Sequence, residues 1–62
     1  MNKLNILIIE DESLVATELQ QAIENMGHNV VEYATNVKMA NKFFEQFEVD
    51  LILMDINLND SL

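Results

Sequence analysis

Acidic side chains stand directly after two aliphatic stretches of the sequence. Glu10 and Asp11 close the first stretch, and Asp55 closes the second. Carboxylates gathered in one place repel each other, so a group of them needs something to offset the repulsion. A hard divalent cation such as Mg²⁺ does so with one or two carboxylates, a carbonyl oxygen and several waters. These residues therefore predict a shared metal site, provided that the fold brings them together.

The elements that must position these acids follow from the hydrophobic pattern. Residues 4–9 and 51–54 are almost unbroken aliphatic runs, as expected of strands that are covered on both faces. Helical spacing over residues 13–26 and 36–47 predicts two amphipathic helices. The β-branched stretch 29–33 predicts a short strand between them. This alternation favours parallel strands joined by right-handed crossovers.

The helix ends and helix faces can be predicted in more detail. Ser13 and Asn36 are the predicted N-caps, and Gly27 is the predicted left-handed stop of the first helix. The aromatic residues are expected in the core. The predicted core-facing stripes are Val15, Leu19, Ala22, Ile23 and Met26 in the first helix and Val37, Ala40, Phe44 and Phe47 in the second.

We therefore expect an α/β fold: a partial, flavodoxin-like doubly wound parallel sheet, β-α-β-α-β, with strand order 2-1-3. In such an open sheet, ligands bind outside the carboxyl ends of the strands where the winding direction switches, here between strands one and three. Neighbouring strands lie about 4.8 Å apart. Glu10 or Asp11 should therefore meet Asp55 in one crevice.

Composition excludes several classes of function. Three lysines against eleven acidic residues give a net charge of −8, which argues against contact with nucleic acid or an anionic membrane. The absence of cysteine excludes disulfides and thiolate sites. The single glycine leaves no phosphate-binding loop, and His28 has no second histidine beside which to bind a metal, so we expect a surface histidine. No apolar run is long enough to span a bilayer and no signal peptide is evident, so a cytoplasmic location is expected.

In its motifs the chain resembles the receiver domain of bacterial two-component response regulators. The resemblance rests on ILIIED at residues 6–11, on Ser13 at the head of the first helix, and on LILMD at residues 51–55 followed by Ile-Asn-Leu. It covers the whole chain in order and spacing. Residues 1–62 would then be the N-terminal part of a single, incomplete receiver domain, truncated after strand three.

The resemblance implies a role for each acid. Asp55 would be the phosphoacceptor, taking a phosphoryl group from a phosphohistidine on a sensor histidine kinase. Asp11 would bind Mg²⁺ or Mn²⁺ directly, Glu10 would hold it mainly through water, and the backbone carbonyl of Asn57 would be a further ligand. A carboxylate is a competent nucleophile for this transfer. The implied function is regulatory phosphoacceptance, not that of an enzyme.

Departures from the family pattern limit what the chain should do alone. Asn59 stands where the family usually has proline, and the family's later hydroxyl residue, lysine and switch aromatic have no counterpart. We therefore expect the 62-residue chain not to complete the phosphoryl site. Because its third strand would be an open edge, we also expect the chain to associate with itself through that strand.

Two other functions share part of this pattern. In a haloacid-dehalogenase-type phosphatase the nucleophile ends the first strand and a second aspartate follows two residues later, whereas here Asp55 ends the third strand and Asn57 follows. A flavodoxin-like cofactor binder holds phosphate with hydroxyls and amides after the first strand, where residues 10–12 are acidic and would repel it. A lysine ending a fifth strand would favour the receiver.

Overall fold

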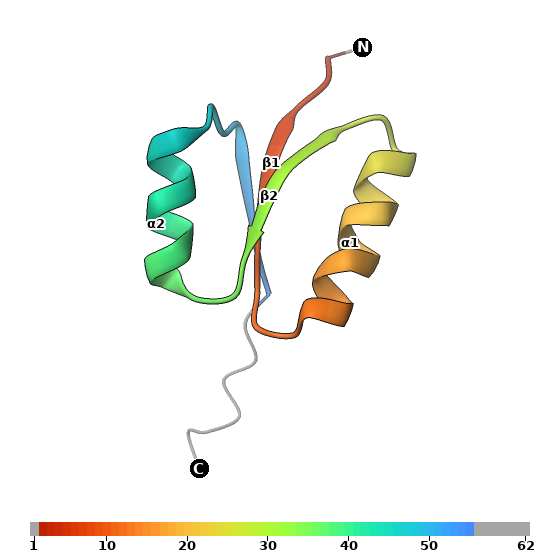
Figure 1. Cartoon of the computed structure of the whole chain (residues 1–62). Coiled ribbons are helices and arrows are strands. Elements are labelled where there is room, and N and C mark those ends of the chain that lie inside the picture. The colour runs from red at the N-terminus through yellow and green to blue at the C-terminus, as the bar shows by residue number, and fades with distance from the viewer. Residues whose placement is uncertain (1, 56–62) are drawn as a thin grey trace.

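The computed structural model describes residues 2–55. They form a three-stranded parallel sheet with one helix on each face (Figure 1). The elements follow in the order β1 (Asn5–Glu10), α1 (Ser13–Asn25), β2 (Asn29–Ala34), α2 (Val37–Gln46) and β3 (Leu51–Asp55). The strands are arranged β2-β1-β3. The predicted fold class and strand order are thus confirmed.

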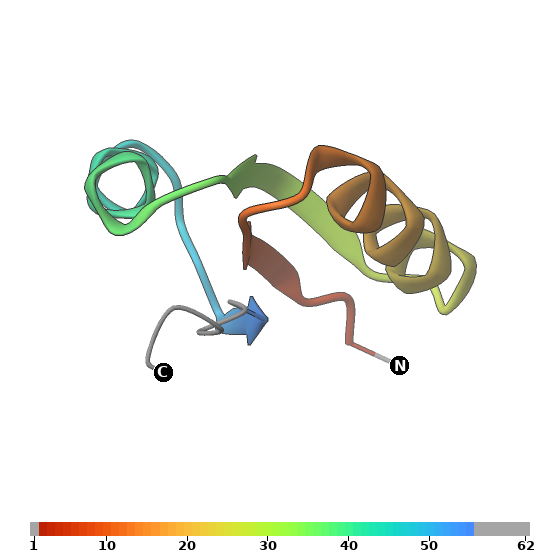
Figure 2. The ribbon, with the colours of Figure 1, turned by 90° about the horizontal axis from the view of Figure 1, so that it is seen from below.

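Strand β1 is central because its side chains serve two cores. Successive side chains of a strand point to opposite faces: Ile6 and Ile8 belong to the core under α1, whereas Leu7 and Ile9 belong to the core under α2. Figure 2 shows the two helices on opposite sides of the sheet. Because both faces of β1 are buried, the central strand requires aliphatic side chains at successive positions.

The helix ends agree with the sequence prediction in two places out of three. The Asn36 side chain accepts a hydrogen bond of 2.8 Å from the backbone N–H of Met39, which caps α2 as predicted. Gly27 has a φ of +93°, the left-handed conformation that ends a helix. Ser13 as the cap of α1 is wrong. The N-cap is Glu12, whose carbonyl oxygen accepts from the N–H of Ala16.

The predicted helix stripes need correction. In α1 the buried residues are Ala16 and Ile23, while Ala22 and Met26 are exposed, because the helix turns a neighbouring face to the sheet. In α2 only Ala40 is buried. The other three residues predicted to face the core there, Val37, Phe44 and Phe47, are exposed, so the expectation that the aromatic residues lie in the core fails for two of the three phenylalanines.

Strand β3 is an edge, as the strand order predicted. Within residues 2–55 it contacts β1, and neither helix packs against it. Leu51, Ile52 and Met54 are therefore 49%, 42% and 60% exposed although they are apolar. The aliphatic sequence of β3 is typical of a strand covered on both faces, but no described element covers this strand.

His28 is not the free surface side chain that the sequence suggested. Its Nδ1 accepts a hydrogen bond of 3.1 Å from the backbone N–H of Leu4, and the side chain is half-buried. The carbonyl of Leu4 in turn accepts from the N–H of Asn29. His28 thereby joins the chain segments that lead into β1 and β2.

The two described helices are each too short or too polar to cross a membrane.

Candidate functional site

The register of the sheet sets Glu10 beside Asp55. These residues are Cα partners at the ends of the parallel strands β1 and β3. Both strands end at the same edge of the sheet, the lower edge in Figure 1. This is the carboxyl edge, where ligands of open α/β sheets bind. Glu10 and Asp55, which were predicted to share a crevice, thus lie directly beside each other on neighbouring strands.

The acids at this edge differ in their exposure. The Glu10 side chain is 4% exposed and is the only buried charged or polar residue among residues 2–55. Asp11 and Asp55 are exposed. Glu10 is therefore buried at this edge of the sheet, whereas the side chains of both aspartates are accessible from solvent.

A hydrogen bond fixes how Glu10 lies. Its Oε2 accepts from the backbone N–H of Glu12 at 3.0 Å. Glu12 is also the N-cap of α1, so the turn that starts the helix is tied to the last residue of β1. This role of Glu12 was not predicted, because the donor is a backbone N–H and the type of side chain at position 12 does not indicate it.

The surroundings of Glu10 raise the pKa of its carboxyl above the ordinary value. The hydrogen bond from the Glu12 N–H acts to lower that pKa. Desolvation, a hydrogen bond with Asp11 and the negative charges of Asp55 and Asp11 act in the opposite direction and together prevail. The negative charges of Asp11 and Asp55 therefore lie close enough to disfavour the ionised form of Glu10, a repulsion that a bound cation would offset.

The donor set suits a hard cation in kind. It consists of carboxylate oxygens, which are the ligands that Mg²⁺ prefers. Within residues 2–55, however, no three acidic or histidine side chains come together closely enough to hold a metal ion. Asn57, the predicted carbonyl ligand, lies outside the described residues, as does Asn59.

The sequence was compared with models of protein families and with curated proteins. The model of the response regulator receiver domain matches residues 6–61. Over 56 residues the chain is 45% identical to the phyllosphere-induced regulator PhyR of Methylorubrum extorquens, which covers 89% of this chain and 21% of PhyR. Over 54 residues it is 33% identical to the aerobic respiration control protein ArcA of Escherichia coli K12, covering 87% of this chain and 22% of ArcA.

The chain thus spans about a fifth of the length of the curated relatives it matches. No solved structure matches it at a significant level. The matched family is the receiver domain that the sequence motifs resemble, and not the phosphatase or the flavodoxin-like binder.

Proposed function

Since the chain belongs to the response regulator receiver domain family of two-component signalling, we propose that it is a phosphoacceptor module in which Asp55 takes a phosphoryl group from a sensor histidine kinase. The observation that carries this proposal is the pairing of Glu10 with Asp55 at the carboxyl edge of the sheet. That Asp55 is exposed also supports it, because a kinase must reach the accepting carboxylate.

Transfer of the phosphoryl group requires one nucleophilic carboxylate and correct positioning of the reacting groups. A carboxylate oxygen of Asp55 forms a bond to phosphorus while the phosphorus–nitrogen bond of the phosphohistidine breaks, and the released imidazole nitrogen keeps the electron pair and takes up a proton. The product is an aspartyl phosphate. The module is regulatory, since the phosphoryl group changes the state of the protein that carries it.

The proposed ligands of Mg²⁺ or Mn²⁺ at this edge are Glu10, Asp11, Asp55 and the backbone carbonyl of Asn57. When bound, the ion offsets the negative charge of phosphoryl oxygens. The register that sets Glu10 beside Asp55 supports the assignment, because it gathers carboxylate oxygens at one edge of the sheet. That residues 1–62 are the N-terminal part of one receiver domain stays a prediction.

The test is labelling of the native protein with acetyl phosphate, a small acyl phosphate, in the presence of Mg²⁺. Asp55→Asn should abolish the label because it removes the nucleophile. Glu18→Gln is the control: it removes an exposed carboxylate of α1 and should leave labelling intact. Label that persists in Asp55→Asn would assign the acceptor elsewhere.

A further inference from the structure

Strand β2, which borders the described sheet on one side, contains a β-bulge. Ile6 of β1 lies opposite Val30 of β2. Its neighbour Leu7 lies opposite Glu32, so that Val31 is an extra residue in β2. The regular repeat of β2 is therefore broken in the middle of the strand.

The hydrogen bonds show which backbone groups of β2 face away from β1. In a parallel pair a residue bonds to the two residues that flank its Cα partner, so the partner itself faces away. The Leu4 carbonyl accepts from the first N–H of β2, and by alternation Ile6 and Ile8 also face β2. Their partners, Val30 and Tyr33, therefore direct their N–H and C=O groups away from β1. We call this side of β2 its outer edge.

The groups on the outer edge do not match the repeat of another strand. A regular strand presents its backbone groups on one side at every second residue. Val30 and Tyr33 are three residues apart because of the bulge, and the side chains of both nevertheless contact the core under α1. A regular strand laid along the outer edge can therefore align with one of these residues but not with both.

A side chain already occupies one of the outward groups. Oε1 of Glu32 accepts a hydrogen bond of 3.1 Å from the backbone N–H of Tyr33, and both residues are half-buried. A carboxylate is a stronger acceptor than a neutral carbonyl oxygen, so the C=O of an incoming strand competes poorly for this N–H. Charged side chains and bulges are two means by which edge strands avoid pairing with other chains.

We propose that Glu32, together with the bulge at Val31, is an autoinhibitory guard that closes the outer edge of β2 to a strand of another protein molecule. Pairing there would have to break the bond between Glu32 and the Tyr33 N–H. It would also have to remove the bulge, which shifts the register by one residue and turns Tyr33 away from the core under α1.

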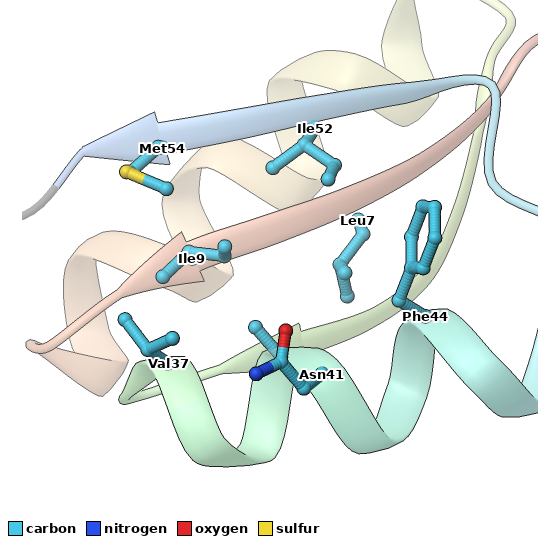
Figure 3. Close-up of a pocket in the computed structure, with 8 residues that line it drawn as sticks. Leu7, Ile9, Val37, Asn41, Phe44, Ile52 and Met54 are labelled. Atoms are coloured by element: carbon cyan, nitrogen blue, oxygen red, sulfur yellow. The ribbon is translucent and has the colours of Figure 1, made fainter.

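Strand β3, at the other side of the described sheet, is built differently. Its register with β1 is continuous over all five residues. Figure 3 shows Ile52 and Met54 of β3 beside an apolar groove of about 250 Å³, across from Val37 and Phe44 of α2. A bulge is therefore not a general property of the strands that border this sheet, and the guard belongs to β2.

Hydrogen exchange in the native protein measures the guard directly. Glu32→Ala should speed exchange of the Tyr33 amide proton about tenfold, because the proton loses a charged acceptor. Glu32→Gln should keep most of the protection, since its amide oxygen can still accept. The Ile8 amide faces β2 inside the ladder and should not change, which controls for general loosening. Unchanged exchange at Tyr33 in Glu32→Ala, or equal acceleration at Ile8, overturns the proposal.

Sedimentation velocity of the native protein at rising concentration tests the consequence for association. Glu32→Val should form larger species than the unaltered protein, because it frees the Tyr33 N–H and valine favours strands. Glu18→Val makes the same change on the exposed face of α1 and should sediment as the unaltered protein does. Glu32→Gln, which keeps an acceptor, should do so too.

Two outcomes of the sedimentation experiment contradict the guard. One is a Glu32→Val protein that folds, as circular dichroism verifies, and associates no more than Glu18→Val. The other is a Glu32→Gln protein that associates as strongly as Glu32→Val, because the charge alone would then keep strands away. If Glu32→Val does not fold, the exchange of the Tyr33 amide in Glu32→Ala and Glu32→Gln decides the matter.

Discussion

Asp50 and Asn5 exchange two hydrogen bonds at the amino edge of the sheet. The backbone N–H of Asn5 donates to Oδ2 of Asp50 at 2.8 Å, and the backbone N–H of Asp50 donates to the carbonyl of Asn5, also at 2.8 Å. The Cα partners that follow are Ile6 with Leu51, and the same register ends with Glu10 beside Asp55. A clamp at one end of β1 and β3 therefore keeps the register that aligns the acids at the other end.

The first prediction concerns this clamp. Asp50→Ala should lower the free energy of unfolding by about 1 kcal/mol, because the Asn5 N–H loses its side-chain acceptor. Asp50→Asn should cost less, since the amide oxygen can still accept that bond. Urea denaturation of the three proteins measures the difference. Equal stability of the alanine variant and the unaltered chain would show that the clamp contributes nothing.

The second prediction is a pH dependence that belongs to Glu10. Its pKa is raised in the folded chain, so folding favours the protonated carboxyl. The corresponding stability is fully present below the ordinary pKa of 4.5 and is lost as the pH rises through the raised value. Glu10→Gln should therefore stabilise the chain at pH 7 relative to the unaltered protein, and should give no such gain at pH 3.

The measurement is the difference in unfolding free energy between Glu10→Gln and the unaltered chain across this pH range. Glutamine can still accept the bond from the Glu12 N–H, so the comparison isolates the charge. Glu18→Gln, the same change on the exposed face of α1, is the control. A difference that is constant with pH, or one of the opposite sign, would contradict the mutual repulsion of the acids.

The third prediction concerns metal. Millimolar Mg²⁺ should shift the backbone amide resonances of Asp11 and Asp55, and a chelator should reverse the shifts. Asp11→Asn should weaken this response at least tenfold, because it removes one charged oxygen ligand. Glu18→Gln, on the exposed face of α1, should leave the response unchanged. Resonances that stay in place at millimolar Mg²⁺ would mean that this chain does not form the site.

Local pattern was sufficient to predict the sheet. The aliphatic runs before Glu10 and before Asp55 each predict a strand, and both strands form, although only the first is covered on both faces by the described elements. Helical periodicity between them requires parallel pairing. Once the strand order is 2-1-3, both acids must lie at the carboxyl edge. The position of the candidate site is thus a consequence of periodicity and topology alone.

Which apolar side chains are buried by tertiary packing could not be predicted in the same way. Phe44 lies on the apolar side of α2, yet it is 55% exposed because no described element covers the groove between α2 and β3. The role of His28 was missed for a related reason. Its acceptor bond from the N–H of Leu4 joins residues that are 24 positions apart, and no local pattern reports such a contact.

The fourth prediction compares the two residues that the sequence proposed as helix caps. The Asn36 side chain accepts from the Met39 N–H, whereas α1 has no side-chain cap bond and Ser13 is already helical. Asn36→Ala should therefore lower the free energy of unfolding by about 1 kcal/mol, the usual value of a lost N-cap. Ser13→Ala should change it little, because alanine is the better helix former. Thermal denaturation of both variants decides the point: equal losses would mean that Ser13 does cap α1 in solution.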